Sequence, residues 1–133
     1  MATIKKVFAT VAVLVETANY GGSAVVVAAD GEYDYTSDVD LETNGYEGSH
    51  VTIEWMGSNT KDDLVVDVFA SLDATTYDTE PFASYVFPNR IARQQASIVV
   101  KDVAHFRLGV KSSGTNTTFE YQISHQAWNR DNS

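Results

Sequence analysis

Hydrophobic and polar residues alternate with a period of two through the middle of the chain. From Leu64 to Leu72 every second side chain is Leu, Val or Ala, which is the spacing that a pleated strand needs to bury one face. A segment rich in Thr and Asp follows at 74–81 and ends in a Pro, and apolar residues return at 82–87. The pattern predicts a central strand over residues 64–72, an excursion from the sheet, and a second strand at residues 82–87.

The same alternation recurs on both sides of this segment, with polar turns between the runs. Asp30 and Gly31 form a dipeptide typical of a hairpin turn, and residues 112–117 have the composition of a second hairpin loop. Residues 7–16 are apolar on every side, and their β-branched side chains favour a strand over a helix. The further strands predicted are 23–29, 32–42, 50–55, 97–103, 105–111 and 118–125, with Trp128 in a tail.

The parity of each strand predicts which side chains face the core. Along residues 32–42 one parity is mostly apolar and the other is almost entirely acidic. We expect Asp34, Asp38 and Asp40 to be exposed on the acidic side. The side chains predicted to be buried are Tyr33, Tyr35, Val39, Leu41, Val51, Ile53, Trp55, Phe106, Leu108, Val110, Phe119, Tyr121 and Ile123.

Short strands at regular spacing, without an amphipathic helix between them, are typical of an antiparallel sandwich or barrel. We therefore predict an all-β fold, an antiparallel β-sandwich that is jelly-roll-like and has about 8 strands. The length of 133 residues fits a single domain. Within it, residues 1–15 would form an N-terminal arm or an extra strand.

The chain is acidic, with a formal net charge of −9, and most acidic residues precede residue 81 whereas most Lys and Arg residues follow it. We expect no nucleic acid partner, because nucleic acids are bound through a basic footprint. The two halves are instead expected to pair, within one copy or between copies. The sequence contains no Cys, so disulfides and thiolate chemistry are excluded within these residues and the redox compartment stays open.

Residues 4–15 resemble a signal peptide, because two lysines precede an apolar run. Cleavage after Ala18 would place Glu16 three residues before the cut, where a small neutral residue is required. The run is also too short to span a bilayer. We therefore expect neither a signal peptide nor a membrane partner.

The acidic side chains from Asp30 to Glu42 leave three interpretations open. They are a solvated face that discourages aggregation at an edge strand, a docking strip for a basic surface, or a calcium site. Asp73, Asp78 and Glu80 supply the oxygen ligands that calcium prefers, but they lack the Gly and the spacing of a calcium loop. We predict no metal site and no cofactor.

Catalytic motifs are absent from the sequence. His50, His105 and His125 lie on separate predicted strands without the spacing of a zinc site. No GxSxG motif is present, and a pair of carboxylates is uninformative among 18 acidic residues. We predict no catalytic residue and no enzyme, with a hydrolase of unrecognised carboxylate site as an alternative.

Aromatic side chains leave a second alternative, a carbohydrate-binding or adhesin module. Such a module needs a surface platform on which a sugar can stack. Trp55 has inward parity and is expected in the core, whereas Tyr77 lies in the excursion and is a surface candidate. The aromatic residues considered for a platform are Trp55, Tyr77, Phe82, Tyr85 and Trp128.

Three segments together resemble the small β-sandwich virion proteins of tailed bacteriophages. They are residues 40–55, residues 67–85 with SLD before a Thr/Tyr/Asp loop, and residues 97–121 with the pattern D-x-x-x-F-R-x-x-V-x-x-S-G. Ala74 stands where a Gly often follows SLD in that family. The resemblance implies a structural role as a capsid decoration protein or other minor virion component. Such a protein is made in the host cytoplasm, self-associates and docks on the outside of the shell.

The apolar N-terminus and the basic loop near residue 90 predict where contacts with other copies or with the capsid shell protein would form. Exposed edges as hydrophobic as residues 4–15 normally mark an interface. The alternative is that residues 7–15 pair inside their own sandwich. The predicted interface residues are Ile4, Lys5, Lys6, Val7, Phe8, Tyr77, Arg90 and Arg93.

Overall fold

The computed structural model describes residues 4–9, 11–16, 25–58, 62–115 and 117–132. All regular structure in these ranges is β-strand, so the prediction of an all-β fold is confirmed. No helix that could cross a membrane occurs within them. The strands are β1 (Ile4–Phe8), β2 (Ala12–Glu16), β3 (Val25–Val27), β4 (Asp34–Tyr35), β5 (Val39–Asp40), β6 (Gly48–Met56), β7 (Leu64–Ser71), β8 (Ala83–Phe87), β9 (Gln94–Lys101), β10 (His105–Ser112) and β11 (Thr117–Asn132).

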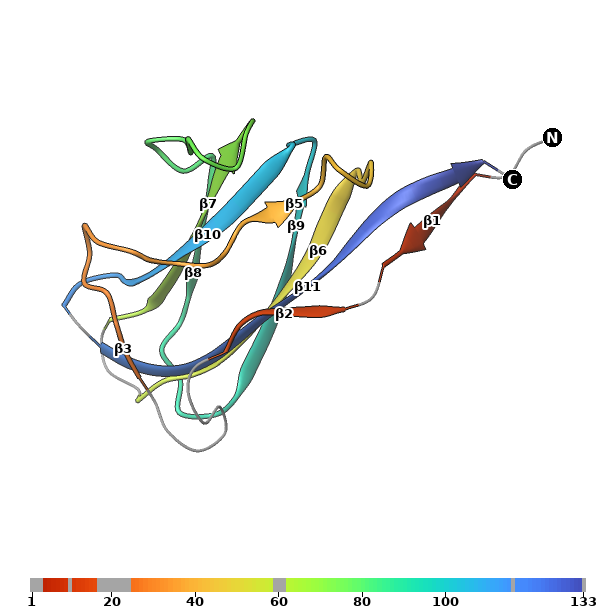
Figure 1. The fold of residues 1–133 in the computed structure, drawn as a ribbon. Helices are drawn as coiled ribbons and strands as arrows, with labels where there is room; N and C mark the ends of the chain where they lie inside the picture. Colours follow the sequence, from red (N-terminus) through yellow and green to blue (C-terminus); the bar gives the residue numbers. More distant parts are fainter. Residues whose placement is uncertain (1–3, 10, 17–24, 59–61, 116, 133) are drawn as a thin grey trace.

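The strands form two antiparallel sheets, laid one over the other (Figure 1). The first sheet has the order β1–β11–β6–β9, with β2 and β3 also beside β11, and the second has the order β4–β10–β7–β8, with β5 also beside β10. The pairing is nested: β1, β2 and β3 pair with β11, β4 and β5 with β10, β6 with β9, and β7 with β8. Grouped in this way the strands fill eight positions of a folded antiparallel ribbon, which is the jelly-roll topology.

Both turns predicted as hairpins connect strands of different sheets. The turn at Asp30 and Gly31 is present, since Gly31 has a φ of 95° and Glu32 donates to the carbonyl of Ala29 at 3.0 Å. However, β3 pairs with β11 and β4 pairs with β10, so the hairpin interpretation is wrong. The link between β10 and β11 likewise crosses the sandwich. Local turn chemistry predicted where the chain bends, but the nested long-range pairing decides the partners.

The core lies between the two sheets and is built from the apolar parity of β6, β7, β10 and β11. Removing each of these side chains from water contributes roughly 1.5–3 kcal/mol, so the alternation in the sequence drives the two sheets together. Glu54 and Thr52 of β6 lie on its other face and are half-buried. The predicted core residues that are confirmed as buried are Val39, Leu41, Val51, Ile53, Trp55, Phe106, Leu108, Val110, Phe119, Tyr121 and Ile123.

The central strand β7 is buried on both faces, which its mixed composition did not indicate. Its outward residues include Phe69, and the rings of Tyr33 and Tyr35 lie 5.1 and 5.7 Å from the Phe69 ring. The segment before β4 therefore covers the outer surface of this sheet. The strand ends at Ser71, and Leu72, which was assigned to the buried parity, is 86% exposed.

The continuous strand predicted over residues 32–42 is wrong. Only β4 and β5 pair with β10 there, because the chain between them bulges around Thr36. Thr36 is buried, its amide donates to the carbonyl of Leu108 at 2.9 Å, and its Oγ1 accepts from the Leu108 amide at 3.0 Å. This interruption shifts the parity, so Tyr35 is 48% exposed, Tyr33 is only half-buried, and Asp38 is half-buried rather than exposed.

The two ends of the described chain meet along β11. β1 pairs with its last residues and β2 with its middle, so the alternative in which the N-terminal segment pairs inside its own sandwich holds for these strands. Trp128 is buried within β11 and does not lie in a tail, because β11 extends to Asn132. In Figure 1, β1 and the end of β11 run together away from the body of the sandwich.

Candidate interaction surfaces

The acidic residues of 30–42 lie along β10 and are partly neutralised by it. Outward positions of β10 carry His105, Arg107 and Lys111. Lys111 Nζ lies 2.8 Å from Asp30 Oδ1, and His105 Nδ1 lies 2.8 Å from Asp38 Oδ2. The hydrogen bond from Lys111 lowers the pKa of Asp30. The acidic segment therefore meets the basic half of the same copy, as the charge distribution predicted.

A buried carboxylate anchors the segment before β4 to the sheet. Asp67 of β7 is buried and accepts a hydrogen bond of 2.5 Å from the Tyr33 hydroxyl and another from the Ser84 hydroxyl of β8. Burial, and then the bond to Asp67, raise the pKa of Tyr33. Lys111 Nζ lies 4.9 Å from the centre of the Tyr33 ring. This contact holds Tyr33 over β7 and β10 rather than leaving it free for a ligand.

Arg107 is enclosed by two aromatic rings on the same outer face. Its guanidinium carbon lies 3.7 Å from the ring centre of Tyr35 and 4.1 Å from that of Tyr77. The Tyr77 hydroxyl donates to Asp38 at 2.6 Å, and burial, followed by this bond, raises the pKa of Tyr77 to about 12. The Arg107 Nε atom is buried without a hydrogen-bond partner. Tyr77 is thus half-buried and engaged within its own chain, not presented as a platform.

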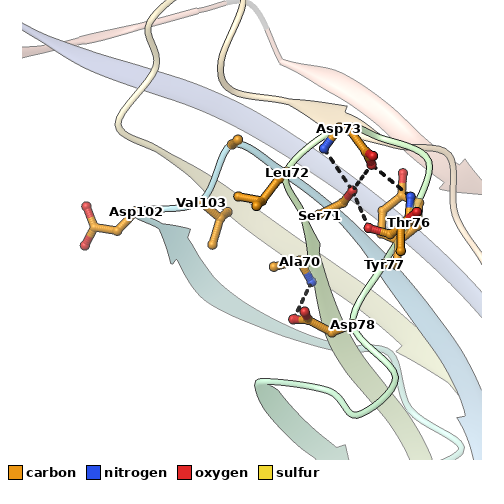
Figure 2. Close-up of a pocket in the computed structure, with 10 residues that line it drawn as sticks. Ala70, Ser71, Leu72, Asp73, Thr76, Tyr77, Asp78, Asp102 and Val103 are labelled. Carbon is orange, nitrogen blue, oxygen red and sulfur yellow. Dashed lines mark hydrogen bonds between the residues drawn. The ribbon is translucent and has the colours of Figure 1, made fainter.

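A pocket of about 400 Å³ lies beneath the excursion that follows β7 (Figure 2). Asp73 accepts hydrogen bonds of 2.9 Å from the amides of Thr75 and Thr76, which lower its pKa. Asp78 accepts a bond of 3.3 Å from the amide of Ala70. In Figure 2 the Asp102 side chain points away from those of Asp73 and Asp78. The carboxylates therefore stabilise the local backbone rather than converge on one point.

The carboxylates and histidines that were considered as metal ligands do not come together in the described residues. No group of three His, Asp or Glu residues in the described ranges is arranged to hold a metal ion. His50 is exposed, His105 contacts Asp38, and His125 Nδ1 lies 3.2 Å from the Ser49 hydroxyl oxygen. The hydrogen bond to Asp38 raises the pKa of His105, whereas burial lowers the pKa of His125.

One lateral edge of the sandwich is open. β8 is the last strand of one sheet and β9 is the last strand of the other, and in the described part of the chain each pairs only with its inner neighbour. Val86 on β8 is 60% exposed and Val99 on β9 is 52% exposed; because each alternates with core residues, the two side chains flank this edge on opposite outer faces of the sandwich. The loop between the two strands adds an exposed Ile91, and Phe82 is exposed just before β8. We refer to residues 82–101 as the β8–β9 edge.

The predicted interface residues fall on three separate parts of the molecule. Arg90 and Arg93 are exposed on the loop of the β8–β9 edge. Tyr77 lies on the outer sheet face described above. Ile4, Lys5, Lys6, Val7 and Phe8 form β1, and Phe8 is exposed; the side chains of the first four lie outside the described residues.

Sequence reasoning missed Arg107 and the exposed valines of the β8–β9 edge. Arg107 lies on the polar side of its strand, and its stacking depends on Tyr35 and Tyr77, which are distant in sequence. Val86 and Val99 sit within apolar runs, so composition alone does not distinguish them from core residues. The available signal was parity, since Ile98 and Val100 on either side of Val99 are buried.

Comparisons with known proteins identify no family. No protein-family model and no curated protein matches the chain. Among solved structures, one described as "Bacillus endospore appendages form a novel family of disulfide-linked pili" aligns with 96% of this chain and 89% of that chain, at 12% sequence identity and a TM-score of 0.37.

Proposed function

We propose that the protein is a non-enzymatic structural component of a phage virion, a capsid decoration protein that self-associates and docks on the outside of the shell. The observation that carries the self-association is the open β8–β9 edge with its exposed apolar side chains. The assignment to a virion rests on the family resemblance of residues 40–55, 67–85 and 97–121.

The composition of β9 supports the proposal that another protein surface covers this edge. An unpaired edge strand exposes backbone donors and acceptors, and monomeric proteins protect such strands with charges, prolines or short length. β9 spans Gln94–Lys101, carries no Pro, and has no charged residue before Lys101. Its exposed Val99 adds apolar surface beside the open backbone. An edge of this kind is expected to be covered by another protein surface.

The fold is compatible with the proposal. Jelly rolls occur in viral capsid and lectin domains, although a fold alone does not assign a function. Two of the segments that carry the resemblance, residues 67–85 and 97–121, contain most of β7 and β8, all of β10, and parts of β9 and β11. They therefore include parts of both open strands.

Two observations weigh against the alternatives. For a carbohydrate-binding module, Trp55 and Trp128 are buried and Tyr77 is stacked on Arg107, while the exposed Tyr35 and Phe82 lie at opposite ends of one sheet. For a hydrolase, a general acid needs a raised pKa, whereas backbone hydrogen bonds lower the pKa of Asp73 in the pocket. Neither arrangement matches the chemistry that the alternative requires.

Two measurements test the proposal. Mass spectrometry of purified virions of the encoding phage is expected to detect the protein, and recombinant protein is expected to co-sediment with shells that lack it. Val86→Asp with Val99→Asp should weaken self-association, because these exposed side chains flank the open edge on the two outer faces of the sandwich. Leu72→Asp, which also replaces an exposed apolar residue but lies off that edge, is the matched control. Absence from virions and failure to bind shells would refute the virion role.

A further inference from the structure

The lateral edges of the sandwich carry opposite charge. Residues 81–101 contain Arg90, Arg93 and Lys101 and no acidic residue. The segment 28–45 contains only acidic charges, at positions 30, 32, 34, 38, 40 and 42. The strong asymmetry between the two halves of the sequence therefore becomes an asymmetry between two sides of the folded molecule.

The topology places these two surfaces where they cannot meet within one copy. β4 and β5, in the acidic segment, lie at one end of their sheet, and β8 lies at the other end, with β10 and β7 between them. Part of the acidic charge is neutralised internally, since Asp30 pairs with Lys111 and Asp38 with His105. Glu32 and Glu42 are exposed, and within the described residues neither side chain forms a hydrogen bond or salt bridge, although the charge of Glu42 contributes to the raised pKa of His105. Their charges remain available to a partner.

We infer that the β8–β9 edge of one copy docks against the acidic segment 28–45 of the next copy, so that the protein assembles head to tail. The inference rests on the proposed self-association and names its partner surface. Two identical β8–β9 edges would bring Arg90 and Lys101 of both copies together in a molecule whose net charge is −9. Opposite charges across a contact speed association and suppress wrong pairings, and like charges disfavour it. A head-to-tail contact of this kind closes into a ring or continues as a filament.

The acidic segment suits a side-chain contact more than a continuous backbone ladder. Its two strands are interrupted between Tyr35 and Val39, so a regular extended edge does not exist there. Charge is therefore the main source of specificity at this contact, and the association should weaken as salt shortens the range of the attraction. An apolar contribution comes from the exposed Ile91 in the loop of the opposing edge, with the exposed Val86 and Val99 flanking that edge on the two outer faces.

Charge-reversal complementation tests the inference. One variant carries Arg90→Glu with Lys101→Glu, and a second carries Glu32→Lys with Glu42→Lys; all four side chains are exposed. Arg90→Lys with Lys101→Arg is the charge-preserving control. Circular dichroism verifies folding, and sedimentation velocity at low salt reports mass. We expect oligomers for the wild type and the control, and at least about tenfold weaker association for each reversed variant alone.

Mixing the two reversed variants gives the decisive result. In the mixture the acidic segment of the first variant meets the basic edge of the second, and the reversed edge of the first meets the reversed segment of the second. Both contacts join opposite charges, so mixed oligomers in which the two variants alternate are expected. If the Glu32→Lys, Glu42→Lys variant assembles like the wild type while the other does not, the β8–β9 edge pairs with itself and the inference is overturned, although self-association stands. A mixture without complexes, or a wild type that is monomeric throughout, also overturns it. The presence of the protein in virions is decided separately.

Discussion

The hydroxyl of Tyr77 donates a hydrogen bond of 2.6 Å to Asp38, 39 residues earlier in the chain. This bond joins two polar excursions of one sheet, the acidic segment beside β10 and the loop that follows the inner strand β7. His105 holds the second oxygen of the same carboxylate at 2.8 Å, and Arg107 stacks on the Tyr77 ring. The outer face of the sheet is therefore ordered by one connected group of polar and aromatic side chains.

Removal of the Tyr77 hydroxyl should separate the two excursions without removing the stacking. We expect Tyr77→Phe to lower the free energy of unfolding by about 1 kcal/mol, because a hydrogen bond to a partly exposed carboxylate is lost. Tyr77→Ala should cost more, since Arg107 also loses an aromatic partner. Urea denaturation gives both values. Tyr85→Phe, whose hydroxyl makes no identified bond in the described structure, is the control, and an equal loss for both Phe variants would contradict the role given to Asp38.

The two partly buried histidines should oppose each other in the pH dependence of stability. The hydrogen bond to Asp38 raises the pKa of His105 in the folded state, so its contribution is complete below the unfolded pKa of about 6.5 and is lost as pH rises through the folded value. Burial lowers the pKa of His125, so its contribution is complete above about pH 6.5 and is lost as pH falls through the folded value.

Single substitutions reveal these opposing slopes. Between about pH 5 and 8, the free energy of unfolding of His105→Gln should fall below that of the wild type mainly at the acidic end. His125→Gln should lack the loss of stability at the acidic end that protonation of His125 causes in the wild type. Urea titrations at several pH values measure the slopes, and NMR titration of the ring protons assigns the two pKa values. A folded-state pKa of His125 above that of His105 would contradict the assignment.

The sequence predicted the fold class well because alternation is a local property. Val51, Ile53 and Trp55 are buried as expected, since each strand reports its own buried face. The prediction of a continuous strand through the acidic segment was wrong for a physical reason. The Thr36 side chain accepts a hydrogen bond from the Leu108 amide and interrupts the strand. No nearby residue signals that contact, because its partner lies on a strand that comes much later in the chain.

The candidate surfaces were predictable only in part. The basic loop with Arg90 and Arg93 was identified from its composition, and the structure places it on an open edge. The opposing position of the acidic segment depends on the order of strands in the sheet, which alternation does not encode. The Arg107 stack also required tertiary placement, because Tyr35 and Tyr77 reach it from two separate segments.

Ala74 occupies a backbone conformation that favours glycine. Its φ is 64°, in the left-handed region, where a side chain with a Cβ costs roughly 1–2 kcal/mol. This is the position at which the resembling family often has Gly. Ala74→Gly should stabilise the protein by about 0.5–1 kcal/mol, since the relief of strain exceeds the added flexibility of the unfolded chain. A shift of the urea midpoint measures it, and Ala74→Val, which should destabilise, tests the same cause in the opposite direction.

Gly109 of β10 should not tolerate a side chain, because Tyr33 and Phe69 close over it. A Cβ at this position would lie 2.6 Å from Tyr33 Cδ1 and 3.0 Å from Phe69 Cε2. Phe69 is buried and cannot retreat, so Tyr33 would move and its bond to the buried Asp67 would be strained. We expect Gly109→Ala to lower the free energy of unfolding by about 1–3 kcal/mol through overpacking.

A double-mutant cycle separates this clash from a general effect of alanine in the strand. Tyr33→Ala removes the nearer obstacle, so the cost of Gly109→Ala should be smaller in the Tyr33→Ala background than in the wild type, with the residual cost due to Phe69. Tyr33→Phe keeps the ring but removes the hydroxyl, so in that background the cost of Gly109→Ala should fall only by the part due to the strained bond to Asp67 and should stay above its cost in the Tyr33→Ala background. Additive free energies for Gly109→Ala and Tyr33→Ala would mean that the ring does not restrict the glycine, and the account of how the segment before β4 is held on the sheet would be wrong.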